Sequence, residues 1–186
     1  KYDAIIKQYA DWAKTIDRPI YLRIGYEFDG PHNELEPKEY VKAYQRIVNL
    51  LRKKGADNIA FVWHSYASPP YMGYELSEWY PGDEYVDWVG ISVFGHAYSA
   101  DFGPDCDNVL NFAREHKKPV MIAESNPVHG IESDNHEVWD QWFVNFFSFI
   151  YEKNIKAVAF INEDWQRLFI QGIEDWKDAK LYNNEM

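Results

Sequence analysis

The chain has 186 residues, a length that fits one domain, and 46% of them are hydrophobic, enough for a substantial core and too many for a disordered chain. Its formal net charge of −11 argues against binding to nucleic acid, because that ligand needs clustered Lys and Arg. A neutral ligand such as a glycan stays open, and the 8 Trp and 14 Tyr supply rings that suit a sugar or a core equally. No run of 18 apolar residues occurs, so no membrane span is predicted.

The first part of the chain alternates between helical and extended patterns. Apolar residues recur at helical spacing over about residues 2–16. A second helix is predicted from Pro37 to Lys54, with proline in its first turn and Gly55 just past its end. Short apolar strands are predicted from Pro19 to Tyr26 and from Ile59 to Trp63.

The same alternation continues after residues 64–85, a long segment with little periodicity and many turn residues. Three more strands and two more helices are predicted there. The strands are Val86 to Phe94, Val120 to Ala123 and Ala157 to Ile161, and the helices are Asn108 to His116 and Glu137 to Lys153.

These strands are apolar along their whole length, which is typical of parallel sheets that are covered by helices on both faces. The predicted fold class is therefore α/β. Five strand-helix units are too few for a closed TIM (β/α)₈ barrel, which needs about 250 residues. An open doubly wound sheet and a piece of a barrel both fit. A helix before the first strand and no closing helix after the last favour an incomplete barrel, with residues 1–186 as a single domain.

Two glutamates follow short apolar runs. Glu27 comes at the end of the first predicted strand and Glu124 at the end of the fourth. Barrel enzymes carry their chemistry at the C-terminal ends of the strands, and a pair of carboxylates there is typical of the acid/base and nucleophile of a glycosidase. The alternatives are a surface ion pair for Glu27 and a helix cap for Glu124. Glu163 and Asp164 compete with them, since they follow the fifth strand.

The spacing on the first strand adds a partner for these carboxylates. Period-two geometry predicts that Arg23, Gly25 and Glu27 share one face. Arg23 then reaches the base of the cleft, where its guanidinium can hold a carboxylate by paired hydrogen bonds.

Other kinds of chemistry find little support. The single Cys106 excludes an internal disulfide. The six histidines form no recognised ligand pattern, and no glycine-rich phosphate loop occurs, so neither a metal nor a cofactor is predicted. Ser92 and Ser125 lack the surroundings of a nucleophile elbow.

Three stretches stand out by their order and spacing: residues 23–30 (RIGYEFDG), 80–91 (YPGDEYVDWVGI) and 122–125 (IAES). Together they resemble glycoside hydrolase family 26, which belongs to the clan of retaining (β/α)₈ barrel enzymes and is best known for endo-β-1,4-mannanases. The resemblance runs over nearly the whole chain and implies that it covers the fourth to eighth strands of such a barrel. It also implies that the missing strands come from a longer natural chain or from a partner.

The resemblance gives roles to the two glutamates. Glu27 matches the acid/base and Glu124 the nucleophile of a double-displacement reaction, in which the acid/base has a raised pKa. Tyr26 departs from the pattern, because the family's mannanases usually carry His before the acid/base. The implied substrate is therefore a β-1,4-mannan or another β-glycan such as a β-glucan.

Residues near the ends of the strands are the candidates for binding a polysaccharide or oligosaccharide. Trp165 is the first aromatic candidate, because many clan members place an aromatic of the eighth strand beneath the cleaved sugar, and His96 is a candidate for a hydrogen bond to Glu124. The full predicted set is Arg23, Tyr26, Trp63, His64, Phe94, His96, Asn162 and Trp165.

The leading hypothesis is a retaining endo-β-glycan hydrolase. The alternatives are a non-catalytic glycan-binding barrel that retains the cleft and a different α/β enzyme on an open sheet. A secreted or periplasmic location is expected for the hydrolase, although no signal peptide is visible in this sequence.

Overall fold

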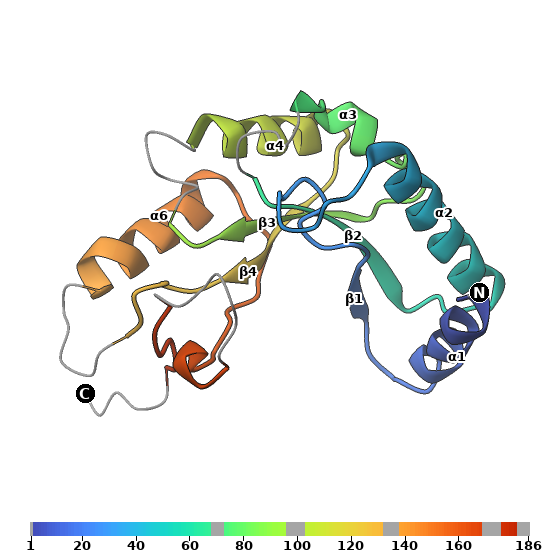
Figure 1. The fold of residues 1–186 in the computed structure, drawn as a ribbon, viewed down its shortest axis with the longest axis horizontal. Helices are drawn as coiled ribbons and strands as arrows, with labels where there is room; N and C mark the ends of the chain where they lie inside the picture. The colour runs from blue at the N-terminus through green and yellow to red at the C-terminus, as the bar shows by residue number, and fades with distance from the viewer. Residues whose placement is uncertain (1, 68–72, 96–102, 132–137, 169–175, 182–186) are drawn as a thin grey trace.

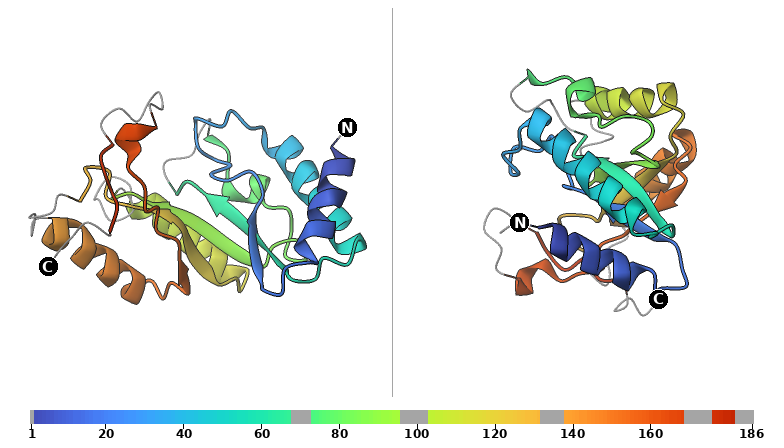
Figure 2. Two further views of the ribbon diagram at one scale, coloured as in Figure 1. Left: turned by 90° about the horizontal axis from the view of Figure 1, so that it is seen from below. Right: turned by 90° about the vertical axis from the view of Figure 1, so that its right-hand side faces the viewer.

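In a computed structural model, which describes residues 2–67, 73–95, 103–131, 138–168 and 176–181, five parallel strands pair in the order of the chain. The sheet curls into part of a barrel, and Figure 1 shows α2, α3, α4 and α6 along its convex side. Figure 2 shows the same curl from two further sides, with α1 packed beside α2. The strands are β1 (Ile20–Arg23), β2 (Ile59–Ser65), β3 (Trp88–Val93), β4 (Val120–Ser125) and β5 (Ala157–Val158).

The helices separate these strands, as an α/β barrel requires. They are α1 (Asp3–Ala13), α2 (Pro37–Lys53), α3 (Leu76–Trp79), α4 (Gly103–Glu115), the π-helical turn η3 (Trp139–Phe143), α6 (Val144–Glu152) and the 3₁₀ turn η4 (Trp165–Arg167). The predicted fold class of an incomplete TIM barrel is confirmed. Among the helices, α3 forms within the segment that showed no periodicity, α4 begins at Gly103 rather than at Asn108, and the last predicted helix begins with a π-helical turn.

The first strand ends earlier than the sequence pattern indicates. Gly25 and Glu27 adopt positive φ values of 58° and 49°, which are incompatible with an extended strand. The backbone therefore turns after Arg23, and the predicted alternation of Arg23, Gly25 and Glu27 on one strand face is wrong. The position of Glu27 is set by this turn.

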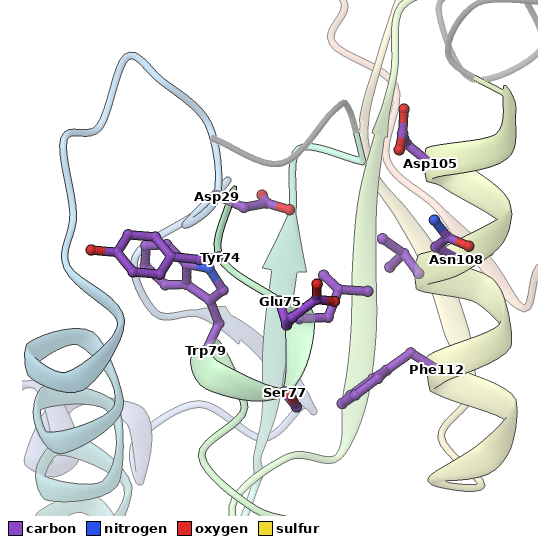
Figure 3. A pocket seen from close by; sticks show the side chains of 10 residues that line it. Asp29, Tyr74, Glu75, Ser77, Trp79, Asp105, Asn108 and Phe112 are labelled. Atoms are coloured by element: carbon purple, nitrogen blue, oxygen red, sulfur yellow. The ribbon is translucent and has the colours of Figure 1, made fainter. Parts of the chain in front are cut away.

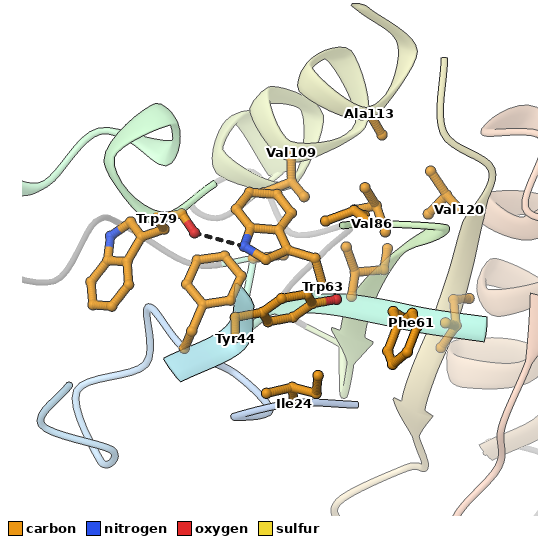
Figure 4. Close-up of a cluster of buried hydrophobic side chains, with 14 of the residues drawn as sticks. Ile24, Tyr44, Phe61, Trp63, Trp79, Val86, Val109, Ala113 and Val120 are labelled. Atoms are coloured by element: carbon orange, nitrogen blue, oxygen red, sulfur yellow. Dashed lines mark hydrogen bonds between the residues drawn. The ribbon is translucent and has the colours of Figure 1, made fainter. Parts of the chain in front are cut away.

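The main core lies between the sheet and the helices, and Trp63 is at its centre (Figure 4). Its side chain is fully buried, its indole stacks on Phe28 at 4.5 Å between ring centroids, and its Nε1 donates a hydrogen bond of 3.1 Å to the carbonyl of Trp79. The prediction that Trp63 forms a sugar platform is wrong. Side chains alternate along β2, so Trp63 points toward the helices while Val62 and His64 point toward the concave face.

Replacing Trp63 with alanine is expected to lower the free energy of unfolding by about 3–5 kcal/mol, because it leaves a large cavity in a close-packed core. Urea unfolding of the protein that carries this chain, followed by circular dichroism, measures the change. The matched control is Trp12→Ala on α1, since half of the Trp12 side chain is exposed, and its effect is expected to be within about 1 kcal/mol. A Trp63→Ala variant of unchanged stability but weaker glycan binding would contradict this assignment.

Candidate active site

The concave face of the sheet carries polar side chains at the C-terminal ends of neighbouring strands. In the sheet register, Arg23 pairs with Val62, His64 with Gly90, and Ser92 with Glu124. The Val62 side chain packs with Met121 in a small cluster separate from the main core, which marks this face as the concave one.

Gly90 makes room for this arrangement. A β-carbon at that position would lie 2.9 Å from Val62 Cγ1 and 3.2 Å from the β-carbons of His64 and Ala123. Such contacts are tighter than a packed interior tolerates unless the neighbouring atoms shift. Glycine therefore lets the imidazole of His64 lie against the middle of the sheet.

Glu124 reaches this face because the strand pairing shifts. Met121 and Ala123 belong to the concave cluster and Ile122 to the main core, so strict alternation would turn Glu124 toward the helices. The register shifts between Ile91 and Ser92, so that Ser92 is opposite Glu124. An irregularity of this kind re-aims one side chain, and such irregularities are common beside active sites.

Glu27 is held by the turn that follows β1. Its carbonyl oxygen accepts hydrogen bonds from the amide of Gly30 at 2.8 Å and from Asn33 Nδ2 at 3.0 Å. The next amide, of Phe28, donates to the carbonyl of His64 at 3.2 Å. These bonds hold Glu27 in the left-handed region, which costs an L-residue about 1–3 kcal/mol and is typical of functional sites.

The Glu27 carboxylate is buried and has two different neighbours. Oε1 accepts a hydrogen bond from Ser92 Oγ, and Oε2 lies 2.8 Å from His32 Nε2. Burial raises the pKa of Glu27; the hydrogen bond from Ser92 opposes this, the charge of Glu124 adds to it, and His32 opposes it. The net direction is upward, which is what a general acid requires near neutral pH.

Glu124 is paired with Arg23. The Arg23 guanidinium donates to Glu124 Oε1 from across the sheet, and both side chains are part-exposed. The guanidinium also lies 5.9 Å from the ring centroid of Tyr26, and Tyr26 itself is 47% exposed. An arginine in this position fixes the direction of the Glu124 carboxylate.

His64 lies beneath the two carboxylates and is fully buried. Its Nε2 is 3.0 Å from Ser92 Oγ, and its Nδ1 is 3.4 Å from Arg23 Nη1. Burial, helped by the charge of Arg23, lowers the pKa of His64 to about 3, so the imidazole is neutral. The expectation that His64 contacts the sugar directly is wrong in this structure, because the polar residues around it cover the ring.

Two of the predicted aromatic residues, Phe94 and Trp165, are connected by Trp176, which was not among the predicted residues. Phe94 and Trp165 both contact Trp176, at ring centroid distances of 4.9 Å and 5.0 Å. Asn162 is exposed, and its Oδ1 accepts a hydrogen bond from the amide of Leu181. The remaining predicted residue, His96, lies outside the described residues.

The sequence patterns did not predict three residues of this region, Ser92, His32 and Trp176, for different reasons. Ser92 is two residues after Gly90 on β3 and therefore shares its face, so period two alone could have placed Ser92 beside the carboxylates. His32 is in an irregular loop, where no periodicity applies. Trp176 follows a segment without a strand or helix pattern.

A separate pocket of about 320 Å³ lies between α3 and α4 (Figure 3). Asp29 lines it from above, and its carboxylate accepts hydrogen bonds from Ser65 Oγ and from the amide of Tyr66. Burial raises the pKa of Asp29. These bonds tie the loop after β1 to the end of β2, so Asp29 supports the turn that holds Glu27.

Within the ranges that the structure describes, no three His, Cys, Asp or Glu side chains gather closely enough to hold a metal ion. No helix in those same ranges has the length and apolar character needed to cross a bilayer.

Comparison with known protein families then decides the classification. The sequence matches the profile of glycosyl hydrolase family 26 over residues 4–184. The chain belongs to glycosyl hydrolase family 26. The matched range contains the positions of both glutamates and of every predicted substrate-binding residue.

Relatives of this family 26 chain are longer than the chain itself. It is 30% identical to a β-1,3-xylanase from Vibrio sp over 98% of the chain and 42% of the relative. A β-1,3-xylanase from Alcaligenes sp is 29% identical over 98% of the chain and 41% of the relative. The chain thus spans about two fifths of the length of these curated relatives.

Solved structures agree on the fold. A family 26 β-mannanase from Bacteroides ovatus superimposes with a TM-score of 0.68 and 16% identity, covering 96% of this chain and 52% of that one. Another family 26 protein, from Muricauda sp. MAR_2010_75, gives a TM-score of 0.65 and 21% identity over 87% of this chain and 48% of its own. At these identities the similarity establishes the barrel fold of the family 26 chain.

Proposed function

We propose that the protein carrying this chain is a retaining endo-acting β-glycan hydrolase, with Glu27 as acid/base and Glu124 as nucleophile. The observation that supports it most is the different environment of the two carboxylates. Glu27 is buried with a raised pKa, whereas Glu124 is paired with the guanidinium of Arg23. Two carboxyl groups in surroundings this different are suited to the roles of one acid and one nucleophile.

The proposed reaction is a double displacement. Glu124 attacks the anomeric carbon and forms a glycosyl-enzyme, while Glu27 gives its proton to the departing glycosidic oxygen. Glu27, now a carboxylate, takes a proton from the incoming water, which releases the sugar and restores Glu124. Arg23 holds the Glu124 carboxylate in place through Oε1. The proposed contacts to the sugar remain Tyr26, Phe94, Asn162 and Trp165, joined by Trp176.

The proposal includes strands from outside this sequence. β1 and β5 are the two ends of the sheet, and each leaves a strand edge to be paired. Tyr21 on β1 and Val158 on β5 are 47% and 43% exposed, as expected for side chains that the rest of a barrel covers. We propose that a longer natural chain or a partner supplies the remaining strands.

The substrate follows from the similarities only at the level of its class. β-1,4-mannan and β-glucan suit the resemblance to the family, and the mannanases among the solved structures share the fold. The β-1,3-xylanases are more similar in sequence, and they make β-1,3-xylan a further substrate of the proposal. Because such polysaccharides are too large to enter a cell, a secreted or periplasmic location is part of the proposal.

A reducing-sugar assay on galactomannan, lichenan, β-1,3-xylan and β-1,4-xylan tests the proposal. We expect hydrolysis of at least one of these polymers by the protein that carries the chain, with oligosaccharides of mixed length as early products. Early release of a single small sugar would contradict endo action. Tight binding to a polymer without any hydrolysis would favour the alternative of a non-catalytic glycan-binding barrel.

A further inference from the structure

Three side chains, Arg23, His64 and Ser92, link the two carboxylates beneath the concave surface. Glu124 Oε1 accepts a hydrogen bond from Arg23, whose Nη1 is also 3.4 Å from His64 Nδ1. His64 Nε2 is 3.0 Å from Ser92 Oγ, and Ser92 Oγ donates to Glu27 Oε1. His64 and Ser92 are both fully buried, so the contact between them is shielded from water.

The chemistry of the groups fixes the direction of every bond in this chain. A guanidinium only donates, so His64 Nδ1 must be the acceptor. The neutral imidazole then carries its proton on Nε2 and donates it to Ser92 Oγ. The hydroxyl of Ser92 has one proton, which it donates to Glu27 Oε1.

We propose that Ser92 and His64 are positioning residues that keep Glu27 Oε1 as an acceptor and thereby hold the transferable proton of Glu27 on Oε2. Oε2 faces His32, whose side chain is 43% exposed, and this is the open side of the carboxyl group. The glycosidic oxygen of a substrate would replace His32 Nε2 at that atom. This inference rests on the proposed acid/base role of Glu27.

Other charged or titratable groups also face Glu27. His32 from the following loop favours its ionised form, while Glu124 from β4 opposes it. Tyr66, after β2, interacts electrostatically with Glu27, and Arg23 from β1 reaches it only through His64 and Ser92. Ser92 donates to the carboxylate form and so lowers the pKa of Glu27. This hydrogen bond is the largest influence on that pKa after burial.

Ser92→Ala is therefore expected to raise the pKa of Glu27 by about one pH unit, because the ionised form loses a charge-assisted hydrogen bond. The measurement is a carbon-13 NMR titration of the Glu27 carboxyl group in the protein that carries this chain, assigned by comparison with Glu27→Gln. Ser92→Cys keeps the volume with a poor donor and is expected to shift the titration in the same direction. The matched control is Ser125→Ala, which removes a buried hydroxyl bonded to the carbonyl of Ala159, and it should leave the titration of Glu27 in place.

His64 is tested through the proton that it donates. His64→Gln retains a donor toward Ser92 and is expected to keep the pKa of Glu27 near its parent value, whereas His64→Leu frees Ser92 to accept a proton from Glu27 and should raise the pKa. In turnover, the alkaline limb of the kcat/KM profile should move upward by the same amount in Ser92→Ala, and kcat should fall roughly tenfold with KM little changed.

An unchanged or lowered pKa of Glu27 in folded Ser92→Ala and Ser92→Cys would overturn the inference. The titration requires no turnover, so it decides this point even if no β-glycan is hydrolysed. Absence of hydrolysis with the expected titration would refute the proposed function and leave the hydrogen-bonded chain as an observed property of the fold.

Discussion

Replacing Glu124 with alanine is expected to lower kcat on the responsive β-glycan by on the order of 10⁴-fold or more, because no other group can form the glycosyl-enzyme. The side chain is part-exposed on the concave face and held by Arg23, so its removal leaves a small cavity beside a cation. Steady-state rates on the polymer measure the loss. Activity that survives the substitution would contradict the assignment of Glu124 as nucleophile.

The same variant offers a second readout. Azide fits the space left by the carboxylate, and it attacks the anomeric carbon from the same side as Glu124 would. With an activated aryl β-glycoside, Glu124→Ala is therefore expected to regain activity and give an α-glycosyl azide, identified by proton NMR. The matched control is Glu163→Ala, another glutamate after a strand, whose Oε1 accepts a hydrogen bond from the amide of Asp164. It should retain activity within a few-fold.

The position of Glu124 shows what sequence patterns can and cannot provide. The apolar run from Val120 to Ala123 predicts a buried strand and places a carboxylate at its end. Strict alternation would nevertheless have sent Glu124 toward the helices, since Ile122 faces the main core. The shift in register opposite Ser92 is a property of two paired strands. It has no signature within either strand alone.

The first strand illustrates the same limit from another side. The apolar residues from Ile20 to Ile24 predict extended structure, and the resemblance to family 26 singles out Glu27. The turn after Arg23 depends on hydrogen bonds that Gly30 and Asn33 donate to Glu27 and on one that Phe28 donates to the distant carbonyl of His64, which a local pattern does not contain. Glu27 lies in this turn beyond the end of β1, so the predicted alternation on one strand face is wrong, while its acid/base role stays a prediction.

The residues of β2 show why aromatic character alone does not identify a platform. Trp63 and His64 are adjacent and both follow an apolar run, so the sequence treats them alike. Alternation sends Trp63 into the core against Phe28 and His64 onto the concave face beneath Arg23. Which face is covered by helices and which by the rest of a barrel depends on the curl of the whole sheet.

Replacing Glu27 with alanine is expected to lower kcat/KM on the polysaccharide by about 10²–10⁴-fold, the usual contribution of a general acid. An aryl glycoside with a dinitrophenolate leaving group needs no proton, so formation of the glycosyl-enzyme from it should be nearly unaffected. Its hydrolysis should then stall at the covalent intermediate, because no base activates water. Pre-steady-state release of the phenolate measures both steps. Equal losses on the polymer and the activated glycoside would contradict the acid/base role.

The pH dependence separates loss of the proton from loss of the side chain. Because burial raises the pKa of Glu27, its deprotonation should set the alkaline limb of kcat/KM, and that limb should disappear in Glu27→Ala and Glu27→Gln. The raised pKa also means that ionised Glu27 destabilises the fold, so the stability of the parent protein falls as pH rises through the pKa of Glu27. Glu27→Gln keeps the shape without the charge. It should therefore become more stable than the parent as pH rises through that range, and less active at every pH, as expected of a carboxyl group held for catalysis at the expense of stability.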